Sequence, residues 1–279
     1  MTDDQAKQSD DSEQPIVTGT QLLDRAVSIL KQLGEAGERG AKMSAIAAAL
    51  ELKTSTAHRI IAALERHGLI EREHATKRYR LGLALFALGA AAADGTGLRK
   101  LCRPALLRLA AETGDTVFLM ARSGLNTVCV DRQEGAYMLD SLTGHVGGQI
   151  PLGVGPASQA ILAFLGEEEA NAVIDANAPL YLKYNGLTAA DVRARLPVVR
   201  EQRFALDDGQ LVAGISAFAV PILPPKRDAV ASIAINMTSA RLNPDRLREL
   251  VARLRHEIEA IERTINPLER DVTRRAMAG

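Results

Sequence analysis

The sequence predicts an α+β chain with two domains joined by a helix, and three observations support this. Apolar residues recur at helical spacing between Gln21 and Arg66 and are followed by two short β-type runs. Residues 83–93 are almost entirely apolar, and helical and β-branched segments alternate beyond Leu98. With 279 residues, 47% hydrophobic and 24% charged, the chain has the composition of a soluble globular protein of two domains.

The N-terminal end carries an acidic tail. Residues 1–14 are polar, with five acids and one lysine among the first 13, and we expect them to be disordered. The first domain is predicted at residues 15–82. It opens with a helix from Gln21 that Gly34 and Gly37 end. Its predicted apolar stripe is Leu22, Leu23, Ala26, Val27, Leu30 and Leu33.

Two further helices are predicted at short intervals. Ser44 is a suitable N-cap for a short second helix that contains Ile46, and a third helix starts at about Thr54. In the third helix, Ala57, Ile60, Ile61 and Leu64 share the face toward the core. The outer side then holds small, polar and basic residues: Ser55, Thr56, His58, Arg59, Ala62 and Arg66.

A hairpin completes the first domain. Residues 69–72 and 77–81 are two β-type runs around a polar turn, with Tyr79 and Leu81 predicted to point inward and Arg78 and Arg80 outward. Three helices followed by a basic hairpin form the winged variant of the helix-turn-helix.

Residues 83–96 are predicted to form a linker helix. Residues 83–93 have almost no polar side, and the run 94–97 is a strong helix breaker. Such a helix must be covered, either by the chain's own second domain or by the same helix of a partner chain.

Charge distribution predicts the partner of the first domain. Net charge is zero, but residues 39–80 hold nine Lys or Arg against four Glu. A run of charges by itself is explained by an ordinary solvated surface. The basic run together with the polar outer side of the third helix predicts binding to double-stranded DNA. The candidate DNA-binding residues are Arg25, Ser44, Lys53, Thr54, Ser55, Thr56, His58, Arg59, Arg66, Lys77, Arg78 and Arg80.

The second domain is predicted at residues 97–268, with a tail at 269–279. Strands joined by turns such as 123–126 imply an antiparallel sheet flanked by helices. Strands are predicted near 116–122, 126–131, 137–142, 204–207, 216–221 and 229–237, and helices up to 113 and over 157–165, 167–177, 188–203 and 243–265.

Several segments resemble the isocitrate lyase regulator (IclR) family. The matching runs are residues 23–30, 53–60, 64–70 and 79–82 in the first domain, and 150–152, 159–165, 207–208 and 214–222 in the second. The resemblance implies a homodimer or homotetramer that binds operator DNA of repeated half-sites, and a GAF-like effector domain that closes on a small organic acid. The direction of regulation is not implied.

The resemblance also implies a set of effector-binding residues. They are Gly155, Pro156, Ala157 and Ser158 on a loop entering a helix, Asp207, and Ser216, Ala217 and Asn236 on later strands. Ala217 stands where the family usually has Cys, Gly153 to Gly155 replace a His-Ala-Thr type of run, Gln159 replaces a frequent Lys, and Gly209-Gln210 replaces an acidic pair. These departures leave the ligand open.

Two local interpretations also stay open. The loop at residues 153–158 suits either an anion cradle at a helix N-terminus or a plain tight turn. Asp207 suits either a ligand contact or a capped turn.

Other classes of protein find less support. Residues 214–218 are not a GxSxG elbow and no HExxH motif occurs, so we expect no catalytic residue, metal site or cofactor. Cys102 and Cys129 are expected to be reduced core thiols. Without a signal peptide or an apolar run long enough for a bilayer, the protein is expected in the cytoplasm, away from membranes. A constitutive DNA-binding protein whose second domain only oligomerises is the main alternative.

Overall fold

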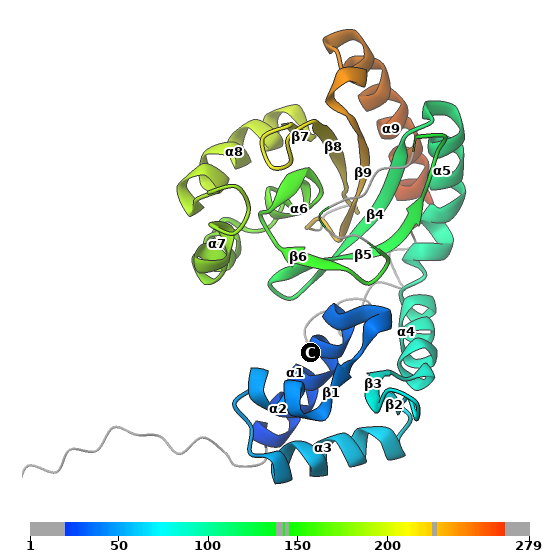
Figure 1. Ribbon diagram of the computed structural model, residues 1–279. Coiled ribbons are helices and arrows are strands. Elements are labelled where there is room, and N and C mark those ends of the chain that lie inside the picture. The colour runs from blue at the N-terminus through cyan, green and yellow to red at the C-terminus, as the bar shows by residue number, and fades with distance from the viewer. Residues whose placement is uncertain (1–19, 138–141, 143–144, 225–227, 266–279) are drawn as a thin grey trace, which may run out of the picture. The chain divides into compact units, whose positions relative to one another are not determined.

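The computed structural model describes residues 20–137, 142, 145–224 and 228–265 (Figure 1). Two compact units are divided between Ala92 and Ala93. The helix α4, Leu83–Thr96, crosses this division.

The described part of the first unit packs the helices α1, α2 and α3 with a small antiparallel sheet. Its strands are ordered β1-β3-β2, so the predicted hairpin is joined by a short third strand that sequence patterns missed. A strand of two residues carries too little alternation to be recognised. The elements are α1 Thr20–Ala36, η1 Gly37–Arg39, β1 Ala41–Lys42, α2 Met43–Ala49, α3 Thr54–Arg66, β2 Ile70–Arg72 and β3 Arg78–Leu81.

The core of this unit confirms the predicted inner face of α3. Ala57, Ile60, Ile61 and Leu64 are all buried. Three of them, Ile60, Ile61 and Leu64, pack in one cluster with residues from every neighbouring element: Ile29, Leu33, Ala41, Ile46, Ile70 and Tyr79. The position of α3 is therefore fixed by hydrophobic burial along one side only.

The predicted stripe of α1 is partly wrong. Leu33 is buried, but Leu23 is 65% exposed and Leu22 and Val27 are exposed too, whereas Ile29 is fully buried. The core covers only one part of the helix, and periodicity alone does not tell which apolar residues the same unit will cover.

Two smaller predictions are also wrong. The helix α2 begins at Met43 with Lys42 as its N-cap, so Ser44 lies in the first turn and caps nothing. Leu81, predicted to point inward, is 42% exposed because it is the last residue of β3 and lies beyond the core.

The second unit is built on a six-stranded antiparallel sheet ordered β6-β5-β4-β9-β8-β7. The predicted strand at residues 137–142 lies outside the described residues except at its two ends, and neither end is in a strand. The elements are α5 Leu98–Thr113, β4 Thr116–Ser123, β5 Asn126–Gln133, β6 Gln149–Pro151, α6 Gly155–Leu162, α7 Glu167–Tyr181, α8 Ala189–Gln202, β7 Ala205–Asp208, β8 Ile215–Ile222, β9 Ala231–Thr238, η2 Ser239–Arg241 and α9 Pro244–Thr264.

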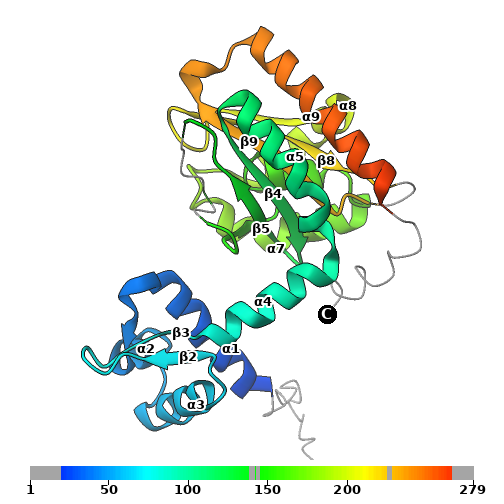
Figure 2. The same ribbon diagram turned by 90° about the vertical axis from the view of Figure 1, so that its right-hand side faces the viewer.

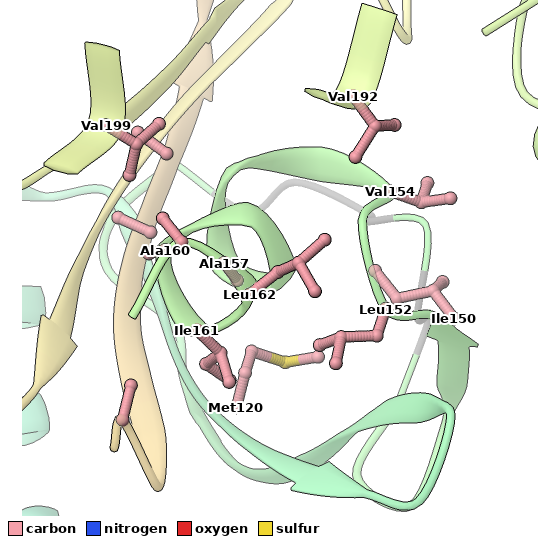
Figure 3. Packing of buried hydrophobic residues seen from close by; sticks show 14 of the residues in the cluster. Met120, Ile150, Leu152, Val154, Ala157, Ala160, Ile161, Leu162, Val192 and Val199 are labelled. Atoms are coloured by element: carbon pink, nitrogen blue, oxygen red, sulfur yellow. The ribbon is translucent and has the colours of Figure 1, made fainter. Parts of the chain in front are cut away.

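Helices cover both faces of this sheet. The helices α5 and α9 pack on one face, and α6, α7 and α8 lie on the other (Figures 1 and 2). Strand β4 alternates accordingly, with Phe118 and Met120 toward α6 and Val117 and Leu119 toward α5. Figure 3 shows the α6 side, where Ile161 and Leu162 lie among Met120, Leu152, Val192 and Val199.

A buried ion cluster joins the start of β4 to the start of α9. The side chain of Asp115 is fully buried and accepts hydrogen bonds from Arg241 Nε at 2.9 Å and Arg246 Nη2 at 2.8 Å. The Arg241 guanidinium also stacks on the ring of Tyr137, 3.7 Å from its centroid. The buried Asp115 carboxylate is therefore paired with two guanidinium groups, and the cluster anchors the start of α9.

Cys102 and Cys129 are buried free thiols, as predicted. Burial, with the nearby Asp131 charge adding to it, raises the pKa of the Cys102 thiol to about 12, so this group stays protonated and unreactive. Within the described ranges, no helix is both long and apolar enough to span a membrane. Among the described residues, no three or more His, Cys, Asp or Glu side chains are grouped so that they could hold a metal ion.

Candidate nucleic-acid interface and ligand cavity

The outer side of α3 faces solvent. Because the inner side packs on the core, the remaining residues form one largely exposed surface, with Thr56 and Ala63 half-buried. Thr54, Ser55, His58, Arg59, Ala62, Glu65 and Arg66 are all exposed. We call Thr54, Ser55, Thr56, His58, Arg59 and Arg66 the α3 outer surface.

The cations of this surface are available to a ligand. Among the described residues, neither Arg59 nor Arg66 has a hydrogen-bond or ion-pair partner for its guanidinium. The helix has 13 residues and is therefore roughly 20 Å long. An α-helix fits the major groove of B-form DNA, where an arginine can donate two hydrogen bonds to guanine. Lys53, at the N-cap of α3, is exposed as well.

The two hairpin arginines differ, because the guanidinium of Arg78 is bound to the protein's own backbone. Its Nη1 donates a hydrogen bond to Gly40 O at 3.0 Å and a longer one to Arg39 O at 3.4 Å, and the residue is half-buried. Pairing of β1 with β3 brings these carbonyls within reach. Arg80 is exposed and forms an ion pair with Glu73 at 3.3 Å.

The other predicted DNA-binding residues lie at separate places in the same unit. Lys77 is exposed in the hairpin turn, with a positive φ of 54°. Ser44 is exposed on α2, and Arg25 is half-buried on α1. Of these three residues, Lys77 is the exposed cation, and it lies in the turn between β2 and β3.

A cavity opens in the second unit between the sheet and the start of α6. Its volume is about 70 Å³, and its walls are mostly apolar. The described lining residues are Phe118, Met120, Leu142, Ile150, Val154, Gly155, Pro156, Ala157, Asp207, Leu211, Val212, Ile215, Ala217, Ala234 and Asn236. This volume is below the roughly 300–1,000 Å³ of pockets for drug-sized ligands, so only a small molecule could occupy the space.

Three of the predicted effector residues form one row across the sheet. Asp207 on β7 is the register partner of Ala217 on β8, and Ala217 is the partner of Asn236 on β9. Adjacent strands lie roughly 4.8 Å apart, so the two polar side chains flank the small methyl group of Ala217. The row places both polar groups on the cavity wall with space between them.

Asp207 is the charged residue among the described lining residues. The residue is only 5% exposed, and its Oδ2 accepts a hydrogen bond from Leu211 N at 3.2 Å. Its Oδ1 is buried and has no hydrogen-bond partner among the described residues. Burial raises the pKa of this carboxyl, because removal from water penalises the charged form.

The loop before α6 is held by hydrogen bonds to the side chain of Ser158. Ser158 is buried, donates to Val154 O and accepts from Gly153 N, so its hydroxyl holds the loop and does not line the cavity. Gly153 has a φ of 110°, and a Cβ there would lie 2.5 Å from Tyr181 Oη. Gly153 is one of the residues that depart from the family pattern, and the position of Tyr181 leaves no room for a larger side chain there.

Two predicted effector residues are therefore placed elsewhere. Ser158 is engaged by the loop, and the Ser216 hydroxyl bonds to Asp208 and to Ser239 Oγ on the opposite side of its strand from Ala217. Gly155, Pro156, Ala157, Asp207, Ala217 and Asn236 do line the cavity. Pro156 lacks an amide hydrogen, which removes one donor from any anion cradle at the start of α6.

Most of the apolar wall was not identified from the sequence. Phe118 and Met120 carried a usable signal, because alternation along β4 places them on the same face. Leu211, Val212 and Ile215 lie on or beside the loop between β7 and β8, where no periodicity marks which residues turn inward.

Comparison with known proteins shows the family to which the chain belongs. Residues 90–263 match the family model described as "Bacterial transcriptional regulator IclR C-terminal". The chain belongs to the IclR family of transcriptional regulators. Residues 22–74 match the IclR helix-turn-helix domain. It is therefore an IclR-family regulator with a helix-turn-helix for DNA and an effector-binding C-terminal domain, and this is a family of regulators and not of enzymes.

Named relatives match over most of their length. The chain is 25% identical over 251 residues to the HTH-type transcriptional regulator XynR of Escherichia coli, covering 88% of this chain and 97% of that protein. It is 27% identical over 231 residues to the transcriptional repressor AllR of Salmonella paratyphi A, covering 82% and 84%.

Solved structures show the same fold. An IclR transcriptional regulator from Alicyclobacillus acidocaldarius aligns with a TM-score of 0.74 at 24% identity, covering 87% of this chain and 97% of that one. An IclR homologue from Microbacterium hydrocarbonoxydans, complexed with 4-hydroxybenzoate, aligns with a TM-score of 0.72 at 21% identity, covering 86% and 97%.

Proposed function

We propose that this IclR-family chain is a ligand-responsive regulator in which the α3 outer surface reads operator DNA and the cavity binds a small organic or aromatic acid. The observation that carries the proposal is the exposed α3 outer surface with its unpaired arginines, in the same chain as a cavity with an unpaired buried carboxylate oxygen. The proposed domains are a DNA-binding domain at residues 15–82, a linker helix at 83–96 and an effector domain at 97–268.

For DNA, we propose a division of labour. Arg59 with Ser55 and His58 contacts base edges in the major groove, because these side chains lie on the exposed side of α3. Lys53, Lys77 and Arg80 contact phosphates and provide the salt-dependent part of the affinity. Thr54, Thr56, Arg66, Ser44 and Arg25 are further candidates for contacts at the edge of the interface.

For the effector, we propose Gly155, Pro156, Ala157, Asp207, Ala217 and Asn236 as contact residues. Their shared feature is a place on the cavity wall. The homologue that carries 4-hydroxybenzoate supports testing aromatic acids on this chain. Asp207 to Ala should leave DNA affinity intact while weakening the response to ligand.

We also propose a homodimer or homotetramer. Leu83 and Phe86 on α4 are 73% and 72% exposed, and Leu88 is exposed as well. Several large exposed apolar side chains on one helix are usually covered in solution, and a second copy would bring two α3 helices to repeated half-sites. Phe86 to Asp should lower the mass measured by light scattering; an unchanged mass would remove α4 from the interface.

The direct test of the function starts with genomic DNA. Purified protein should retain specific fragments, and their shared sequence defines the operator. A panel of small carboxylic and aromatic acids is then titrated against the protein–operator complex. At least one acid should change operator affinity, whereas specific binding that no acid alters would favour a constitutive DNA-binding protein with an oligomerising second domain.

A further inference from the structure

The unpaired oxygen of Asp207 indicates which chemical group the cavity selects. Its Oδ1 is buried, has no hydrogen-bond partner among the described residues, and belongs to a residue on the cavity wall. A buried acceptor without a partner destabilises the empty site, so a ligand that brings a donor recovers this free energy on binding. The group that completes the site is therefore a hydrogen-bond donor.

The surroundings of Asp207 argue against a ligand carboxylate at this point. Asp207 and Asn236 are the polar side chains among the described lining residues, and Lys, Arg and His are absent from that set. A carboxylate beside Asp207 would face a like charge, and the cation that acts on Asp207, Arg195, is not among the described lining residues. Pro156 also withholds an amide hydrogen from the start of α6, which weakens the alternative anchor for an anion.

The row Asp207, Ala217 and Asn236 provides the space for such a donor. Ala217 contributes one methyl group between the two polar side chains, and Phe118 and Ala234 form the next row along the sheet. The ligand would therefore place a polar group at this row and an apolar body against Phe118 and Met120.

We infer that the cavity selects ligands by a hydroxyl group donated to Asp207 Oδ1 on a small apolar or aromatic body, and that a carboxylate, where the ligand has one, points away from Asp207. This inference rests on the proposed effector-binding role of the cavity and specifies its ligand class. Phenol then contains the recognised part, benzoate lacks it, and anisole replaces the donor by a methyl ether of similar shape.

The test compares these three probes on the full-length protein by calorimetric or NMR titration at neutral pH. The wild-type chain should bind phenol about tenfold more tightly than anisole or benzoate, the size expected for a hydrogen bond to a charged acceptor. Asp207 to Ala should bring phenol and anisole within about twofold of each other. Asp208 to Asn is the matched control, because Asp208 bonds to Ser216 outside the cavity lining, and it should keep the preference.

Two further variants keep the inference testable if Asp207 to Ala does not fold. Asp207 to Asn turns an amide donor toward the cavity and should raise the affinity for benzoate relative to phenol. Ala217 to Leu fills the space in the row and should abolish phenol binding. Equal wild-type affinities for phenol and benzoate, no phenol binding at millimolar concentration, or a phenol preference that survives loss of Asp207 would each overturn the inference.

Failure of this inference differs from failure of the proposed function. If an acid from the panel alters operator affinity but its binding ignores Asp207, the regulator is ligand-responsive and the hydroxyl rule is wrong. If no small molecule alters operator affinity while phenol still binds through Asp207, the cavity is selective but does not regulate DNA binding.

Discussion

The Arg78 guanidinium donates a hydrogen bond to the carbonyl oxygen of Gly40 at 3.0 Å. The contact joins β3 to the turn before β1 and uses a side chain that a basic hairpin would otherwise present to DNA. Arg80, two residues further on, is exposed and forms an ion pair with Glu73. Arg78 therefore stabilises the fold, whereas Arg80 on the same strand stays exposed to solvent and to a ligand.

The first prediction separates these uses. Arg78 to Ala should lower the free energy of unfolding by about 1 kcal/mol, because it removes a part-buried hydrogen bond to the Gly40 carbonyl. Arg80 to Ala should change stability by less than about 0.5 kcal/mol, since its ion pair is exposed, but should reduce the salt slope of DNA binding by about one. Urea unfolding and salt titrations check both. Equal stability of the two variants would contradict the role assigned to Arg78.

The second prediction concerns the anchor of α9. Asp115 to Ala leaves Arg241 and Arg246 half-buried without their counter-ion, and it should cost about 3 kcal/mol of unfolding free energy. Asp175 to Ala, which removes an exposed partner of Arg193, is the control and should cost less than about 1 kcal/mol. If urea unfolding shows that the two variants lose similar amounts of unfolding free energy, Asp115 does not anchor α9.

The third prediction uses two buried hydroxyls. Thr127 Oγ1 is buried without a hydrogen-bond partner among the described residues, so Thr127 to Val should be neutral or stabilise the fold by up to about 1 kcal/mol. Ser232 Oγ donates to Ala157 O at 2.8 Å, so Ser232 to Ala should destabilise it by about 1 kcal/mol. Thermal unfolding should move in opposite directions; a loss in both variants would mean that the Thr127 hydroxyl has a partner.

The inner face of α3 and the sheet of the second unit were predictable because both follow from periodicity. Ala57, Ile60 and Ile61 recur at helical spacing, and burial of one side leaves the α3 outer surface exposed. The row of Asp207, Ala217 and Asn236 was found through resemblance to a family, since residues far apart in sequence meet only through strand register.

What remained unpredicted depends on tertiary contacts. Leu23 and Ile29 are both apolar positions on α1, and only the packed unit decides that the second is covered. Arg78 and Arg80 are equivalent in the sequence pattern, and only β1 pairing distinguishes them. The apolar cavity wall comes from several strands and loops, so no local pattern marks it.

The fourth prediction follows from the raised pKa of Asp207. Because burial raises its pKa in the folded chain above that in the unfolded chain, the folded state binds more protons, and this carboxyl stabilises the fold less as pH rises through the folded pKa. Asp207 to Asn removes the ionisation, so the variant should be more stable than wild type at pH 7. The gain should shrink toward the unfolded pKa of about 4. Urea unfolding of wild type and Asp207 to Asn at pH 7 and at about pH 4 checks the direction of this change. An equal difference in unfolding free energy at the two pH values would contradict the prediction.

The α3 outer surface is the central claim, and the measurement that tests it most directly is the affinity of Arg59 to Ala for the selected operator and for unrelated duplex DNA. Arg248 to Ala, which removes an exposed arginine of α9, is the control and should bind both DNAs as wild type does. The account predicts that Arg59 to Ala weakens operator binding by about tenfold or more while binding to unrelated DNA falls far less, because a bidentate contact to a base is worth about 1–3 kcal/mol. Operator affinity equal to that of wild type would show that α3 does not read the operator through this side.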